Sequence, residues 1–170
     1  IYLGLMQNLA SHLDYTALKP GMTQRDALKL CAQADEYGFA AACLPPYFVS
    51  LAGDILSGSP VKVCTVVGFP HGMHLMEAKL VETQQLIQAG AEELDLVANL
   101  AAFRSGELAY WQEEIKAFAQ LCRQARVTSK VIIESGLLSL SEVKTAANLC
   151  AEAQVDFVKT PLDLPKLARN

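Results

Sequence analysis

The sequence predicts an α/β fold in which helices cover a parallel β-sheet, and three observations support this prediction. Short runs of strand-forming residues alternate along the chain with longer helix-like segments. At three places a helix end passes directly into a strand, in the segments EYGFAAACL, QAGAEELDLV and EAQVDFVKT. No glycine-rich phosphate-binding motif follows any predicted strand, which disfavours a nucleotide-binding sheet. This rhythm is typical of a βα barrel or of a doubly wound sheet.

Six strands are predicted, with helices between them. The strands are expected at residues 13–16, 39–44, 61–68, 93–99, 130–135 and 155–160, and two long helices at about residues 75–90 and 107–126. Thr23 and Asp26 form a capping-box pattern that begins a helix, and Gly38 is the residue expected to end it. Ser139 and Glu142 form a second capping box, which begins the helix before the last predicted strand.

Length and composition favour one globular domain, expected to span residues 1–170. The chain has 170 residues, 52% of them hydrophobic and 19% charged, which is enough for a substantial core. Its net charge of −4 gives no field that would attract nucleic acid or an anionic membrane. The first ten residues contain no Lys or Arg, and no apolar run approaches the length of a membrane span. We therefore expect a cytoplasmic protein without a signal peptide or a nucleic-acid or membrane partner.

The cysteines and histidines do not predict a metal site. The five cysteines form no CxxC pair and no Cys/His cluster, and they lie in apolar stretches: Cys31, Cys43, Cys64, Cys122 and Cys150. Their pattern is typical of buried thiols in a reducing compartment. His71 and His74 share one loop, and His12 is far away in the sequence, so no third ligand stands near the pair.

Polar residues at the ends of the predicted strands are the candidates for chemistry. Buried parallel strands should read as continuous apolar runs, so a charged residue within one is informative. Asp14 and Thr16 lie in LDYT, Asp95 in ELDLVAN, Lys130 in KVIIE and Lys159 in VDFVKT. In a βα barrel the active site lies at the carboxyl ends of the strands.

Strand alternation predicts that several of these side chains share a cavity. It places Asp95 with Val97 and Asn99, Lys130 with Ile132 and Glu134, and Lys159 with Phe157. If these faces point inward, two lysines and a carboxylate meet. A lysine is a nucleophile only when neutral, and with a reference pKa near 10.4 only about one in 2500 is neutral at pH 7. Burial and a neighbouring cation lower that pKa, and an acid within reach then transfers protons.

Structural alternatives exist for each candidate. Lys159 could be a surface lysine, and Asp95 could pair with a lysine without catalysing anything. Lys130 begins its predicted strand, which favours the bottom rim of a barrel or a salt bridge. Asp14 could be a turn or capping residue, and Cys43 fits a core thiol better than a nucleophile, because no His–Asp pair accompanies it.

Five motifs together resemble the deoxyribose-phosphate aldolase family over roughly residues 11–160. They are LDYTALKP (13–20), KVCTVVGFPHG (62–72), GAEELDLVANL (90–100), KVIIES (130–135) and DFVKT (156–160), in the family's order and spacing. The resemblance implies a TIM (β/α)₈ barrel with about six of its eight βα units in this chain. It further implies a class I Schiff-base aldolase that reversibly cleaves 2-deoxy-D-ribose 5-phosphate to acetaldehyde and D-glyceraldehyde 3-phosphate. The resemblance implies that the reaction needs no metal or organic cofactor and that the substrate is a small phosphorylated sugar. We also expect a homo-oligomer.

The resemblance also implies roles for individual residues. Lys159 in FVKT matches the Schiff-base lysine, and Asp95 in ELDLV matches the aspartate of the proton relay. Lys130 in KVIIE matches a lysine close to that aspartate. The positions that match substrate-binding residues are Asp14, Thr16, Cys43 and Thr160.

The chain departs from the family pattern in its last residues. The family usually continues FVKT with a Ser-Thr-Gly segment, whereas this chain continues PLDLPKLARN, where Pro161 and Pro165 disfavour a central strand. The strands expected to be missing are the seventh and eighth, with the loops that hold phosphate. Tyr15 stands where the family has a histidine, and Gln154 where it has a glycine. Two alternatives therefore remain: an inactive barrel remnant that acts through assembly, and another lysine-dependent barrel aldolase.

Overall fold

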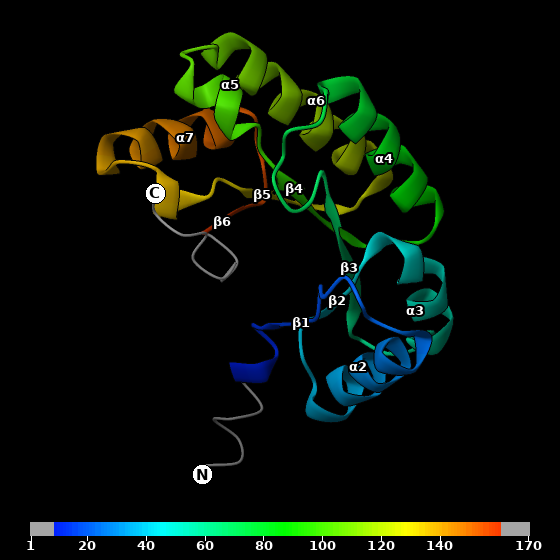
Figure 1. Cartoon of the computed structure of the whole chain (residues 1–170). Helices are drawn as coiled ribbons and strands as arrows, with labels where there is room; N and C mark the ends of the chain where they lie inside the picture. The colour runs from blue at the N-terminus through cyan, green and yellow to red at the C-terminus, as the bar shows by residue number, and fades with distance from the viewer. Residues whose placement is uncertain (1–8, 161–170) are drawn as a thin grey trace.

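A computed structural model of the chain describes residues 9–160, and its centre is one parallel six-stranded sheet (Figure 1). The strands are β1 (Asp14–Thr16), β2 (Ala41–Cys43), β3 (Lys62–Val67), β4 (Glu93–Val97), β5 (Thr128–Ile132) and β6 (Phe157–Lys159). They follow one another in the sheet in the same order as in the sequence. A doubly wound sheet reverses its strand order at a switch point, so the consecutive order selects the barrel alternative.

Helices and short 3₁₀ turns connect the strands. They are α2 (Gln24–Tyr37), η1 (Pro46–Phe48), α3 (Val49–Ile55), α4 (Met76–Gln88), α5 (Leu100–Arg104), α6 (Leu108–Ala125), η2 (Ser135–Leu137) and α7 (Leu140–Glu152). Both predicted capping boxes are confirmed: Thr23 with Asp26 caps α2, and Ser139 with Glu142 caps α7. Gly38 ends α2 in the left-handed conformation, as predicted. No helix in the described part is long and apolar enough to cross a bilayer.

The sheet curls so that the helices lie on its outer side, and β1 and β6 lie at its two ends (Figure 1). The main core lies between sheet and helices and includes Leu44, Leu94, Val131 and Phe118. A small second cluster consists of Ala41, Cys43, Cys64 and Val66, which alternate along β2 and β3 with main-core residues. Because alternate residues of a strand point to opposite faces, this cluster defines the inner face of the curl.

Two local differences from the predicted elements have physical causes. β5 begins at Thr128, two residues earlier than predicted, because the polar Thr128 and Ser129 pair with β4 through the backbone. β4 ends at Val97, and Asn99 instead caps the short helix α5, whose Ala102 amide donates to its side chain. Asn99 therefore does not continue the face of Asp95, contrary to the prediction.

A buried ion pair holds the outer layer to the carboxyl end of β4. Lys79 of α4 and Glu114 of α6 are 1% and 0% exposed, and Lys79 Nζ lies 2.9 Å from Glu114 Oε1. The same ammonium donates to the Val97 carbonyl at 2.9 Å, while the other Glu114 oxygen accepts from the Asn99 amide at 3.1 Å. Burial lowers the pKa of Lys79 and raises that of Glu114, against the attraction between them. Each charge is tolerated there only because of the other.

Breaking this pair from one side should therefore destabilise the protein strongly. Lys79→Met leaves the Glu114 carboxylate buried without its cation, and we expect a loss of about 3–5 kcal/mol in unfolding free energy. The double variant Lys79→Met/Glu114→Gln removes both charges and keeps an acceptor for the Asn99 amide, so it should recover most of that loss. Chemical denaturation measures both. The matched control is Lys62→Met, which breaks the exposed Lys62–Glu92 pair and should cost about 1 kcal/mol or less. Equal losses in the two single variants would contradict this account.

The sheet has two edges within the described residues. β1 pairs only with β2, and β6 pairs only with β5. The β6 edge is apolar, because Phe157 is 58% and Val158 is 42% exposed. An edge strand with exposed apolar side chains is a template for pairing with another chain. The expectations for residues 161–170, including Pro161 and Pro165, lie outside the described residues.

We expect a chain of these 170 residues to self-associate through this edge. Light scattering should show oligomers or aggregates at micromolar concentration, and Val158→Lys should reduce the associated fraction, because an edge lysine opposes strand pairing. Lys144, on the exposed side of α7, provides the matched position, since Lys144→Glu also changes charge without touching the edge. A monodisperse monomer of the unmodified chain would contradict the expectation.

Candidate active site

Lys159 and Asp95 come together on the inner face of the sheet. Lys159 is the last residue of β6, and its Nζ lies 2.5 Å from Asp95 Oδ2. The Asp95 side chain is 2% exposed and that of Lys159 is 24% exposed. The lysine is therefore open on one side to a molecule entering from the carboxyl ends of the strands, while its carboxylate partner is shielded from water.

Lys130 joins the same cluster from the middle of β5. Its side chain is 7% exposed, and its Nζ lies 3.4 Å from Asp95 Oδ1. It also contacts the carboxylate of Glu93, two residues before Asp95 on β4. The bottom-rim alternative for Lys130 is wrong, because β5 begins at Thr128 and carries Lys130 into the sheet. Lys130 does form salt bridges, and these are compatible with a catalytic role.

Asp14 connects the first strand to the fifth and sixth. Its Oδ2 accepts from Lys130 Nζ at 3.0 Å and from Lys159 Nζ at 3.2 Å. Asp14 is the first residue of β1, so these bonds cross the inside of the curl between the two ends of the sheet. The turn or capping alternative for Asp14 is therefore wrong: its carboxylate binds two catalytic candidates.

The carboxylates dominate the electrostatics of the cluster. Burial lowers the pKa of Lys159, but Asp95 and Asp14 raise it, and the net pKa lies above its ordinary value. Burial likewise opposes the charge of Lys130, yet neighbouring acids, among them Asp95 and Glu93, raise its pKa. Burial works against the charge of Asp14 as well, and the two lysines bring its pKa below the ordinary value. Lys130 lowers the pKa of Lys159 as predicted, but less than the acids raise it. The resting Lys159 is thus an ammonium ion beside a proton acceptor.

The other predicted substrate-binding residues lie near this cluster or at its rim. Thr16 ends β1, is exposed, and donates through its hydroxyl to the Asp14 carbonyl at 3.1 Å. Cys43 ends β2 and is 1% exposed on the inner face. Thr160 directly follows β6 and is exposed. Within residues 9–160, none of the three side chains forms a hydrogen bond with Lys159 or Asp95.

The sequence patterns do not single out two members of the cluster, Glu93 and Cys64. Glu93 shares the face of Asp95 by strand alternation. The Sγ of Cys64, on β3, lies 3.6 Å from Asp95 Oδ1. Lys130 Nζ lies 3.5 Å from the same sulfur. The alternation that singled out Asp95 could have found Glu93. Cys64 stands in an apolar run, where nothing in the sequence distinguishes it from a core thiol.

Cys43, Cys64 and Asp95 also have the composition of a metal site. Their ligand atoms lie within 4.8 Å of one another. The structure thus brings together two thiols that no sequence motif connects. The ammonium of Lys130 already contacts both Cys64 and Asp95, and that of Lys159 contacts Asp95. Lysine cations thus stand where a metal would need to bind.

An apolar cavity of about 440 Å³ opens beside the inner cluster. Leu18, Val66 and Phe69 line it and also pack on or belong to the cluster around Cys43 and Cys64. The remaining lining comes from the segments that follow β1, β2 and β3, including Met22, Tyr47 and Pro70. The carboxyl ends of the first three strands therefore offer room for a small molecule.

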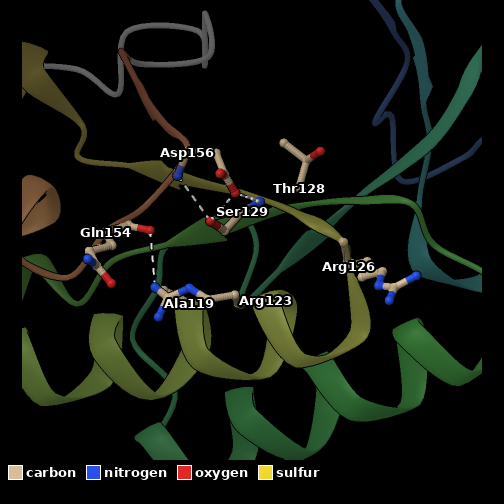
Figure 2. Close-up of a pocket in the computed structure, with 8 residues that line it drawn as sticks. Ala119, Arg123, Arg126, Thr128, Ser129, Gln154 and Asp156 are labelled. Atoms are coloured by element: carbon tan, nitrogen blue, oxygen red, sulfur yellow. Dashed lines mark hydrogen bonds between the residues drawn. The ribbon is translucent and has the colours of Figure 1, made fainter.

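A second cavity, of about 250 Å³, lies at the opposite ends of the strands (Figure 2). Several of its polar groups hold the fold: Asp156 accepts from the amide and hydroxyl of Ser129 at 2.8 and 2.7 Å. Arg123 of α6 donates to the carbonyls of Ala153 and Gln154 at 3.4 Å each, and Figure 2 shows it directed toward Gln154. These bonds connect α6, β5 and the segment before β6. We interpret this cavity as structural.

Comparison with known proteins agrees with this geometry. The model of the DeoC/LacD aldolase family matches residues 10–168. The deoxyribose-phosphate aldolase of Caldanaerobacter subterraneus subsp. tengcongensis is 42% identical over 156 residues, and that of Clostridium perfringens is 44% identical over 154 residues. Each match covers 91% of this chain and 68% of the relative.

A solved structure of the Aeropyrum pernix deoxyribose phosphate aldolase, described as a unique tetrameric structure, superimposes with a TM-score of 0.85 at 33% identity. The match covers 92% of this chain and 65% of that one, so the chain spans about two thirds of the length of such relatives. The six parallel βα units are thus part of a TIM barrel. With the family model covering nearly all of the sequence, the chain belongs to the DeoC/LacD aldolase family.

Proposed function

We propose that the protein is a class I aldolase that reversibly cleaves 2-deoxy-D-ribose 5-phosphate to acetaldehyde and D-glyceraldehyde 3-phosphate. The observation that carries the proposal is the contact of Lys159 with Asp95, on the face where two further lysine–carboxylate contacts meet. A primary amine and a buried carboxylate at 2.5 Å are what Schiff-base chemistry requires: a nucleophile and a group that takes up its proton. The substrate is taken from the relatives, which are deoxyribose-phosphate aldolases.

In this proposal Lys159 begins the reaction by losing its proton to Asp95. The neutral amine attacks the aldehyde carbon of the open-chain sugar and forms a carbinolamine, whose hydroxyl leaves as water once it has received a proton. The resulting protonated imine withdraws electrons from the bond between C2 and C3. That bond breaks as the C3 hydroxyl loses its proton, which releases D-glyceraldehyde 3-phosphate and leaves an enamine. Protonation at C2 and hydrolysis then free acetaldehyde and the amine.

Asp95, Lys130 and Asp14 have distinct parts in this scheme. Asp95 transfers protons, because its Oδ2 contacts the nucleophile directly. Lys130 neutralises Asp95 and Asp14, since its ammonium contacts both. Asp14 orients the two lysines from the other end of the sheet. Thr16, Cys43 and Thr160 are proposed to contact the sugar, on the basis of their matching positions in the family.

The catabolism of deoxyribose phosphate is the proposed physiological role, and a cytoplasmic homo-oligomer the proposed form. The tetramer named for the A. pernix relative and the exposed apolar edge at Phe157 and Val158 both support association of copies. Residues 1–170 are proposed to form part of a single barrel domain. The exposed edge also favours the alternative in which this chain acts only through assembly, and activity distinguishes the two.

A coupled assay tests the function directly. The protein expressed from its complete gene is incubated with 2-deoxy-D-ribose 5-phosphate, and D-glyceraldehyde 3-phosphate is followed by a dehydrogenase. Turnover that survives a metal chelator supports the proposal. A protein that is folded, binds aldehyde covalently and yet leaves this sugar intact would indicate another lysine-dependent aldolase. A folded protein that binds no aldehyde would support the assembly alternative.

The electrostatics predict that Asp14 affects the pH dependence of Schiff-base formation at Lys159. Only the neutral amine of Lys159 reacts, so the rate of Schiff-base formation should rise with pH as the ammonium loses its proton. Asp14 is one of the groups that raise the pKa of Lys159. In Asp14→Asn that influence is gone, and the rise should occur at lower pH. Borohydride trapping of acetaldehyde across pH measures the midpoint, with the exposed Asp54→Asn as control. An unchanged or higher midpoint would refute the role assigned to Asp14.

A further inference from the structure

We propose that Cys64 is a positioning residue of the active site: its thiol fixes the Asp95 carboxylate so that one oxygen faces Lys159 while the other faces Lys130. This inference rests on the proposed function, because it concerns the same lysine–carboxylate cluster. It assigns a role to a side chain that the reaction scheme does not otherwise use.

Three atoms form a nearly equilateral arrangement. The Sγ of Cys64 lies 3.6 Å from Asp95 Oδ1, Lys130 Nζ lies 3.5 Å from that sulfur, and Lys130 Nζ lies 3.4 Å from Asp95 Oδ1. The second oxygen, Oδ2, is left for Lys159 at 2.5 Å. The two oxygens of one carboxylate thus have different partners. Rotation of the carboxylate would break the thiol contact and the Lys159 contact together.

A neutral thiol suits this position because it donates and accepts at once. The S–H group donates to Asp95, and the sulfur accepts from the ammonium of Lys130. Cys64 is fully buried at 0% exposure, next to Cys43, its partner in the pairing of β2 with β3. Contact with the Cys43 thiol, burial and the charge of Asp95 raise the pKa of the Cys64 thiol well above its ordinary value, which preserves the S–H group that the Asp95 contact requires.

The other interpretation of Cys64 is simple packing on the inner face beside Ala41, Cys43 and Val66. Packing requires only a side chain of suitable volume, whereas positioning requires a polar hydrogen directed at Asp95. Substitutions separate the two. Cys64→Val keeps an apolar side chain without a donor, and Cys64→Ser keeps a donor. Cys64→Ala removes both the volume and the donor.

The experiment measures kcat and KM for 2-deoxy-D-ribose 5-phosphate in the protein expressed from its complete gene. Rates are divided by the amount of Lys159 that borohydride traps with acetaldehyde after long incubation, so that misfolded protein does not count. We expect Cys64→Val and Cys64→Ala to lower kcat about 10- to 100-fold with KM changed less than about threefold, since small displacements of a reacting group have costs of this order. Cys64→Ser should retain kcat within about threefold.

The matched control is Cys122→Ala, which removes a thiol that is equally buried, at 0% exposure, in the outer core on α6. It should leave kcat and KM unchanged per trapped site. If Cys64→Val keeps the wild-type kcat, or if Cys64→Ser loses as much as Cys64→Ala, the positioning role is overturned. The proposed function fails separately, when the wild-type protein itself traps no aldehyde. If the wild type traps aldehyde but does not cleave this sugar, the rate of trapping replaces kcat in the same comparison.

Discussion

Replacing Lys159 with Met is expected to abolish aldol cleavage. The variant keeps a side chain of similar length but lacks the amine that forms the carbon–nitrogen bond with the substrate. Loss of a covalent nucleophile lowers turnover by about 10⁶-fold in well-studied enzymes, which places the variant below detection in a coupled assay. The fold should survive, because Asp95 keeps its contacts with Lys130 and Cys64.

The comparison variant is Lys144→Met, on the exposed side of α7. It should cleave 2-deoxy-D-ribose 5-phosphate at the wild-type rate, and circular dichroism should show the same helix content in both variants. Cleavage by Lys159→Met at more than about one thousandth of the wild-type rate is incompatible with a Schiff base on Lys159, because no other group in the scheme supplies covalent catalysis.

Asp95→Asn is expected to reduce turnover about 10²- to 10⁴-fold, the usual contribution of a positioned proton-transfer group. The amide has the shape of the carboxylate, so the packing of β4 should persist. It cannot, however, take the proton from Lys159 at 2.5 Å or return it during dehydration and at the enamine. The loss should therefore appear both in kcat and in the rate at which acetaldehyde is trapped.

The exposed Asp54→Asn on α3 is the control for the loss of one carboxylate, and it should leave both rates unchanged. A loss of less than about threefold in Asp95→Asn, with the fold intact, would show that Asp95 is structural. The paired measurement matters because Asp95 also contacts Lys130 and Cys64, so the stability of the variant needs to be determined beside its rate.

The fold was predictable from sequence because its signals are local. The capping boxes at Thr23 and Ser139, the stop at Gly38 and the apolar strands all depend on residues close in the chain. α5 was not predicted, since five residues carry too little periodicity, and its cap by Asn99 became evident only from the structure. The sequence predicts the start of β5 two residues too late, because Thr128 and Ser129 are polar. In the structure both residues pair with β4.

The site was only partly predictable because its contacts join distant parts of the chain. Strand alternation indicated that Asp95, Lys130 and Lys159 face one cavity, but no local pattern shows that Asp14 bridges two lysines across the curl. Cys64 enters through the register of β3 with β4, which the sequence does not specify, whereas the alternation along β4 could have indicated Glu93. The balance of charges around Lys159 depends on how many acids reach it. The pKa of Lys159 accordingly lies above its ordinary value. Burial and a neighbouring cation, without these acids, predict a pKa below that value.

The identity of the reactive lysine is the central claim, and trapping the intermediate tests it most directly. The protein expressed from its complete gene is incubated with acetaldehyde, reduced with borohydride, digested and mapped by peptide mass spectrometry. We predict one ethylated lysine, Lys159, formed in proportion to the loss of aldolase activity, with Lys130 unmodified because carboxylates and the Cys64 sulfur surround its ammonium. An adduct on Lys130 or on any other lysine, with Lys159 free in an active preparation, would contradict the account.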